Sequence, residues 1–132
     1  MQISKHRIIT IAAIALISTI IIVVFVNLKN VHLKFYNKTG EDIDSLVVGE
    51  TYIGKVKKDS STKFIGFKKL MFDNGIPYDK ITGIIKGKKY VKLSRSQCGS
   101  GRQMVSEGEF VFHIELWTGK DGITYLNLLN VY

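Results

Sequence analysis

A run of nineteen residues without a charge, from Ile8 to Val26, follows Lys5 and Arg7 near the start of the chain. An α-helix rises about 1.5 Å per residue, so this run would span roughly 28 Å, close to the hydrocarbon thickness of a bilayer. Its three hydroxyl side chains can bond back to a carbonyl one turn earlier, which lipid tolerates. We therefore predict a single transmembrane helix over residues 8–26.

A secretory signal peptide begins in the same way, with a basic head and an apolar stretch. Its apolar region is typically about 7 to 15 residues long and ends in a small-residue cleavage site. This run is longer and ends at Phe25-Val26, and its alanines all precede Leu16. We expect an uncleaved signal anchor, with a cleaved signal and a buried soluble helix as the alternatives.

The predicted anchor divides the chain into a head of residues 1–7, the span 8–26, a linker 27–30 and a domain 31–132. Basic residues are nearly balanced on the two sides of the span, so they barely decide its orientation. Long domains translocate largely regardless of their charge. We expect a cytoplasmic N-terminus and a C-terminal domain exported to the periplasm or the extracellular space.

The composition after the anchor indicates the fold class. These 106 residues contain no alanine, whereas Val, Ile, Phe, Tyr and Thr are plentiful. Alanine is the best helix former, and branched and aromatic side chains suit a pleated sheet. We expect an all-β domain, namely one small antiparallel β-sandwich that is immunoglobulin-like or a small barrel.

Alternation of apolar and polar residues locates the strands. The clearest example places Phe110, Phe112, Ile114 and Leu116 on one face of a strand. Residues 57–61 are predicted to be the loop of a hairpin. The segment around Pro77 is predicted to be a loop, because proline is disfavoured within a sheet. The predicted strands cover residues 31–36, 43–48, 51–56, 62–67, 70–72, 81–85, 89–93, 110–117 and 123–132.

The net charge of +8 is concentrated in one stretch. From Lys55 to Lys92 there are eleven lysines and three aspartates, a local balance of +8. We predict a face for an anionic partner, which is phospholipid, an acidic glycan or an acidic protein. Its residues are Lys55, Lys57, Lys58, Lys63, Lys68, Lys69, Lys86, Lys88, Lys89 and Lys92.

The alternative role of these lysines is to keep a small β-domain soluble and to prevent pairing of its sheet edges. Nucleic acid is not an expected partner. An exported domain rarely meets it, and the lysine-rich stretch lacks arginines and clustered stacking aromatics.

The single cysteine, Cys98, lies in a predicted loop between Arg95 and Arg102, whose charges can lower a thiol pKa. One cysteine cannot form an internal disulfide. Three interpretations stay open: an inert thiol, an intermolecular disulfide, and a nucleophile paired with His113 or His32.

Two pairs of polar side chains each share one side of the chain, namely His113 with Glu115 and Glu107 with Glu109. A zinc site needs three or four ligands, and we interpret both pairs as surface groups. We expect no catalytic residue, no metal and no cofactor. Asn37 begins an Asn-Lys-Thr pattern for N-glycosylation, which has meaning only in a eukaryotic secretory pathway.

Small residues form a stripe on the predicted helix, because Ala12, Ala15 and Thr19 lie on one side of it. Small side chains let helices approach closely in membranes. This stripe is a candidate contact with a partner helix.

Three functions are compatible with these patterns. The first is a membrane-anchored, non-enzymatic β-domain that binds another envelope protein or an anionic surface ligand. The second is an accessory single-pass subunit of a larger membrane complex. The third is a small thiol-dependent enzyme that uses Cys98 or the side of the sheet with His113 and Glu115. The first hypothesis also implies a protein partner in or at the membrane.

Overall fold

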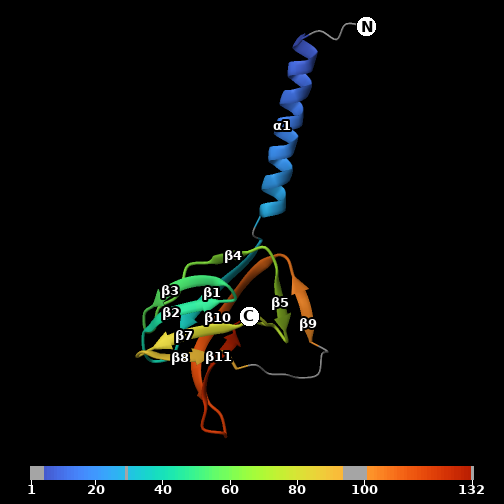
Figure 1. Ribbon diagram of the computed structural model, residues 1–132. Coiled ribbons are helices and arrows are strands. Elements are labelled where there is room, and N and C mark those ends of the chain that lie inside the picture. Colours follow the sequence, from blue (N-terminus) through green and yellow to red (C-terminus); the bar gives the residue numbers. More distant parts are fainter. Residues whose placement is uncertain (1–4, 29, 94–100, 132) are drawn as a thin grey trace.

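The computed structural model describes residues 5–28, 30–93 and 101–131. In them the chain forms one long N-terminal helix followed by a domain built from β-strands (Figure 1). The predicted combination of one apolar helix and a mostly β chain is confirmed.

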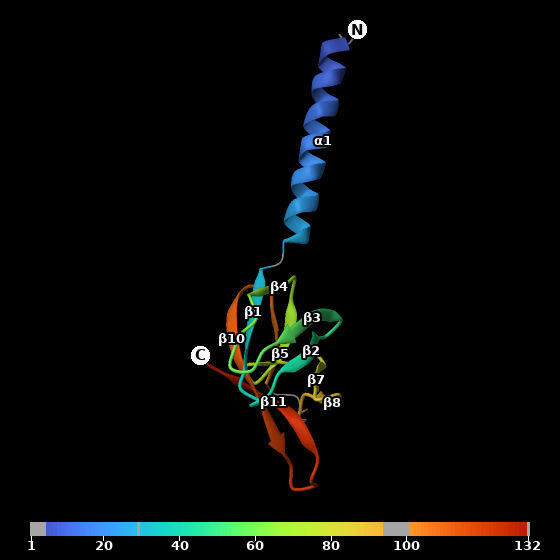
Figure 2. The ribbon, with the colours of Figure 1, turned by 90° about the vertical axis from the view of Figure 1, so that its left-hand side faces the viewer.

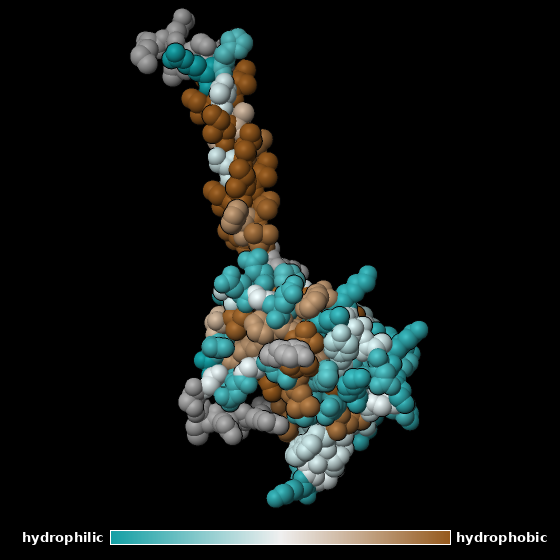
Figure 3. Space-filling model, turned by 180° about the vertical axis from the view of Figure 1, so that it is seen from behind, coloured by the Kyte–Doolittle hydropathy of each residue, from teal (hydrophilic) through white to brown (hydrophobic). Residues whose placement is uncertain are grey.

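Helix α1 (Lys5–Asn27) carries no charged residue after Arg7, and the side of it that Figure 3 shows is mostly apolar. The side chains of residues 6–26 are all exposed, so the β-domain covers none of them. The hydroxyl groups of Thr10 and Thr19 donate to the carbonyl oxygens of His6 and Ala15, at 2.9 and 2.8 Å. These bonds satisfy the hydroxyl groups of Thr10 and Thr19 within the helix. In length and composition α1 fits a membrane anchor or a signal sequence.

The described strands form three sheets, whose strand orders are β11-β10-β1-β4, β3-β2-β7-β8 and β6-β5-β9. We name them the β10 sheet, the β2 sheet and the β5 sheet. The two four-stranded sheets lie on opposite sides of the domain (Figure 2). The strands are β1 (Val31–Asn37), β2 (Ile43–Val48), β3 (Thr51–Val56), β4 (Ile65–Phe67), β5 (Leu70–Asp73), β6 (Ile76–Pro77), β7 (Ile81–Ile85), β8 (Lys88–Val91), β9 (Arg102–Val105), β10 (Gly108–Thr118) and β11 (Thr124–Asn130).

One strand pair departs from the predicted antiparallel arrangement. Strands β1 and β10 are parallel, with Val31 opposite Gly108 and Asn37 opposite Ile114. Both strands therefore begin at the end of the domain that is joined to α1. Strand β10 continues four residues beyond Ile114, so the β10–β11 hairpin extends past β1 at the opposite end (Figure 1).

The predicted hairpin around residues 57–61 is wrong. Strand β3 pairs with β2, whereas β4 pairs with β1 in the other four-stranded sheet. The backbone between β3 and β4 bonds to β1 instead: the amide of Asn37 donates to Ser60, and the amide of Asp59 donates to Asn37. This segment therefore crosses from one sheet to the other.

Two short strands were not predicted, β6 and β9, and both pair with β5 at the edges of the β5 sheet. Pro77 lies in β6, opposite Phe72. Proline is acceptable there because an edge strand needs no amide donor on its free side. Strand β4 begins at Ile65 rather than at Thr62, whose hydroxyl accepts from the amide of Phe35.

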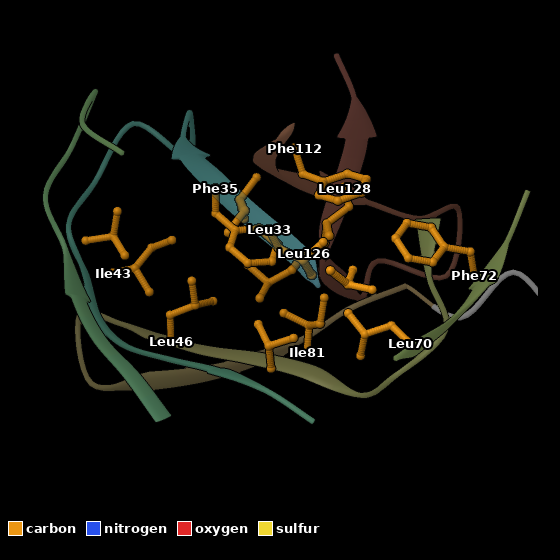
Figure 4. Packing of buried hydrophobic residues seen from close by; sticks show 14 of the residues in the cluster. Leu33, Phe35, Ile43, Leu46, Leu70, Phe72, Ile81, Phe112, Leu126 and Leu128 are labelled. Carbon is orange, nitrogen blue, oxygen red and sulfur yellow. The ribbon is translucent and has the colours of Figure 1, made fainter. Parts of the chain in front are cut away.

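One hydrophobic core lies between the sheets, and side chains of all three contribute to it (Figure 4). The rings of Phe35 and Phe112 stack at 5.9 Å between centroids. Phe112 and Ile114 are buried, and Phe110 and Leu116 pack against the core, so the predicted inner face of β10 is confirmed. Burial of such side chains stabilises the fold by about 25 cal/mol for each Å² of apolar surface removed from water, and this is the main stabilising contribution.

Candidate functional site

Six of the predicted lysines gather at one end of the β2 sheet because of its antiparallel register. Ile43 at the start of β2 lies opposite Val56 at the end of β3. Ser45 lies opposite Ile84, near the end of β7, and Ile85 lies opposite Lys88 at the start of β8. The same end of the sheet thus holds Lys55, Lys57, Lys58, Lys86, Lys88 and Lys89, which we name the lysine end.

Part of this positive charge is neutralised locally. Lys55 forms ion pairs with Asp42 at 2.9 Å and with Asp44 at 3.4 Å, and Lys86 pairs with Glu41 at 2.6 Å. The backbone amide of Lys58, together with Lys55, lowers the pKa of Asp42 below its ordinary value. The same contact with Asp42 raises the pKa of Lys55.

Four lysines at this end keep their charge available. Within the described residues, no carboxylate lies within ion-pair distance of the Nζ atoms of Lys57, Lys58, Lys88 or Lys89. All four are exposed, and Lys88 also lies over the ring of Tyr90, at 5.3 Å. Lys57 and Lys58 follow the edge strand β3, and Lys88 and Lys89 lie in β8 at the opposite edge of the sheet. Edge strands of a four-stranded sheet are roughly 14 Å apart. The arrangement suits an extended anion better than a single small one.

The other predicted lysines lie elsewhere, so the ten do not form one face. Lys63 precedes β4, and Lys68 and Lys69 connect β4 to β5, next to the start of β1. Lys92 is partly buried and donates to the backbone carbonyl of Pro77. Burial lowers the pKa of Lys92, and its contact is internal to the fold.

The remaining sequence candidates are dispersed. His113 lies against the ring of Tyr36, with ring centroids 5.6 Å apart, and Glu115 lies opposite Asn127. Among the described residues, no three potential ligands come close enough to hold a metal ion. Glu107 and Glu109 are exposed at the start of β10. Cys98 lies outside the described residues.

Asn37 has a structural role that its sequence pattern did not suggest. It is completely buried. Its Nδ2 atom donates to the carbonyl oxygens of Glu41 and Val56, and its Oδ1 atom accepts from the amide and the hydroxyl of Thr39. A buried amide nitrogen that already donates to two carbonyl oxygens is not presented for attachment of a glycan.

The predicted helix contact lies on α1, where Ala12, Ala15 and Thr19 are exposed. The Thr19 hydroxyl is bonded to the carbonyl of Ala15, which turns its polar atom toward the helix itself. No part of the described β-domain approaches this side of the helix.

Sequence reasoning missed an aromatic surface on the outer face of the β10 sheet. Trp117 is 44% exposed and lies beside Tyr125, with ring centroids 6.4 Å apart. Tyr36 and His113 form a second ring pair on the same face. The sequence shows which residues of β10 share its outer face. Which residues of β1 and β11 lie beside them depends on strand pairing and register.

No protein-family model matches the chain, and neither does any curated protein or solved structure.

Proposed function

We propose that this protein is a membrane-anchored, non-enzymatic binding module whose lysine end binds an anionic ligand at the surface of the envelope. The proposal includes an uncleaved anchor, a cytoplasmic N-terminus and an exported domain folded as a small β-sandwich. The observation that carries it is the position of four lysines at the end of the β2 sheet where Lys55 and Lys86 form ion pairs. The four are Lys57, Lys58, Lys88 and Lys89.

The electrostatics support this choice. Exposed positive charges that have no local partner attract anions over roughly a Debye length, about 8 Å at physiological salt. Lys55 and Lys86 pair with three carboxylates, so the six lysines of the lysine end leave an excess of three positive charges there. Only three residues lie between the end of α1 and the start of β1, so the anchor would also keep the domain at the membrane surface.

A direct test measures binding of the full chain, in neutral phosphatidylcholine nanodiscs, to dextran sulfate and to uncharged dextran. The proposal expects binding to dextran sulfate alone, with a marked loss at high salt. Replacement by Gln of the four lysines Lys57, Lys58, Lys88 and Lys89 should weaken binding by at least about tenfold, or 1.4 kcal/mol.

The matched control removes the same charge at other exposed positions, by replacing Lys63, Lys69, Lys80 and Lys120 with Gln. If both variants lose affinity equally, net charge rather than the lysine end is responsible. Equal binding of dextran and dextran sulfate would also contradict the proposal.

An accessory subunit of a membrane complex is the alternative, with α1 as the contact through Ala12, Ala15 and Thr19. Extraction of native membranes in mild detergent and native mass measurement separates the two functions. A stable complex with another membrane protein favours the subunit, and a monomer favours the binding module.

A further inference from the structure

Two aromatic pairs lie on the outer face of the β10 sheet. On β10, the alternate residues His113, Glu115 and Trp117 face away from the core, because Phe112, Ile114 and Leu116 face into it. Tyr36 of β1 contacts His113 edge-on, and Tyr125 of β11 lies beside Trp117.

A polar pair lies between the two aromatic pairs. Glu115 and Asn127 are cross-strand partners on β10 and β11, and both are partly exposed. Residues two apart on a strand are about 7 Å apart, so the ring pairs are separated by roughly 14 Å with the polar pair midway. Figure 3 looks onto this side of the domain, and side chains of intermediate hydropathy, drawn pale, cover its lower end, where the β10–β11 hairpin lies.

The order of groups along this surface differs from that of a protein interface. Protein interfaces have an apolar centre and a polar rim, whereas here the carboxylate and the amide are central and the rings are at the two ends. A sugar ring has an apolar C–H face that packs on an aromatic ring, and its hydroxyl groups bond to carboxylate and amide groups. The surface therefore has the chemistry that a glycan chain requires.

The charge at the centre of the surface disfavours an anionic glycan. Glu115 lies between the ring pairs, whereas the charges at the two ends are of opposite sign: the Lys34 amine lies over the ring of Tyr36 at 5.1 Å, and the Asp121 carboxylate accepts a hydrogen bond from the hydroxyl of Tyr125. A central carboxylate repels an anionic chain. A polyanion would instead meet the lysine end, on the other four-stranded sheet.

We propose that this surface is a binding strip for an uncharged glycan chain, formed by Tyr36, His113, Glu115, Trp117, Tyr125 and Asn127. The ring pairs stack on sugars at its two ends, and Glu115 and Asn127 bond to the hydroxyl groups of the sugar between them. The strip is separate from the lysine end and does not depend on it.

The chain offers a direct probe of this site, since Trp117 is its only tryptophan. The full chain in phosphatidylcholine nanodiscs, which contain no sugar, is titrated with neutral oligosaccharides while Trp117 fluorescence is recorded. The panel holds α- and β-linked hexasaccharides of hexose and of N-acetylhexosamine. We expect a saturable fluorescence change with at least one of them, and no effect of salt on its affinity.

Variants test the individual contacts. Tyr125→Ala removes one stacking ring and Glu115→Gln removes the central charge, and each should weaken binding by at least about tenfold. The matched controls are Tyr52→Ala on β3, where the side chain is 69% exposed, and Glu50→Gln in the β2–β3 turn. Both controls should bind like the unchanged chain.

Three results would overturn the proposal. They are no saturable change with any member of the panel, unchanged affinity in Tyr125→Ala, and a Trp117 response to dextran sulfate that disappears at high salt. The first two do not bear on the lysine end, because dextran sulfate binding in the four-lysine variant is measured separately. The third would place the polyanion on the strip and would therefore count against both proposals.

Discussion

The side-chain amide of Asn37 donates a hydrogen bond of 2.9 Å to the backbone carbonyl of Val56, which joins the end of β1 to the end of β3. These strands belong to different sheets. The same side chain bonds to the backbone of Glu41 and Thr39, so it also fixes the turn after β1. The buried amide of Asn37 thus stabilises the turn through which the chain passes from one sheet to the other.

Replacement of Asn37 by Ala should be strongly destabilising. It leaves the buried carbonyl of Val56 and the groups of the turn without their partner, at a cost of about 2 to 4 kcal/mol. The melting temperature of the full chain in detergent should fall by at least about 8 °C. Asn127→Ala, on the outer face of β11, is the control and should change it little. Equal effects would show that the buried amide has no special role.

Gly83 of β7 marks a close approach between the two four-stranded sheets. A Cβ atom there would lie 3.2 Å from Cγ2 of Ile43 and 3.3 Å from Cδ1 of Leu126. Gly83→Ala should therefore overpack the core and lower the free energy of unfolding by about 1 to 3 kcal/mol. Thermal unfolding measures this, with Thr82→Ala as the neighbouring control. A neutral Gly83→Ala would contradict the observed packing between the sheets.

Lys86 adopts a left-handed backbone conformation, with φ of 50°, in the turn before Gly87. Asn is favoured at such turn positions, so Lys86→Asn should stabilise the chain by about 0.5 kcal/mol. The substitution also removes the exposed ion pair with Glu41, which contributes little. Glu41→Gln measures the share of that pair alone. A lower melting temperature in Lys86→Asn, but not in Glu41→Gln, would contradict the prediction.

Asp42 should contribute to stability in a pH-dependent way. Its pKa in the folded chain is below the ordinary value of 3.8, so folding favours its ionised form. The stability is present above the unfolded pKa and is lost as pH falls through the folded pKa. Asp42→Asn should lower the melting temperature at neutral pH, with a difference that shrinks below about pH 4. Glu50→Gln is the control, and a pH-independent effect of Asp42→Asn would contradict this origin.

The proposed anchor predicts that residues 8–26 stay in the mature protein and in lipid. Ile17→Arg places a charge near the middle of α1, which costs about 2.5 to 3.5 kcal/mol in insertion. The variant should lose membrane association that resists alkaline extraction, whereas Ile17→Leu should keep it. Intact mass gives an independent measurement. A membrane-bound wild-type chain that lacks the first 26 residues would contradict the anchor.

Much of the local structure could be predicted because it depends on local patterns. The apolar run predicted α1, and the pattern of apolar and β-forming residues predicted β1, β2, β3, β5, β7, β8, β10 and β11 with bounds that differ by few residues from those observed. Strand β9 was missed because Arg102, Gln103 and Met104 are all exposed and show no alternation. It is a strand because it pairs with β5, which is remote in sequence.

The candidate sites divide in the same way. The sequence alone determined an apolar helix, a β-rich domain and an excess of lysine, because composition and period act within a few residues. Only the tertiary structure decided that β1 and β10 are parallel, that Lys55 and Lys86 are neutralised by Asp42 and Glu41, and that Tyr36 lies beside His113. These relationships join residues that are distant in the chain. Strand order and register decide which side chains meet, and no local sequence pattern encodes them.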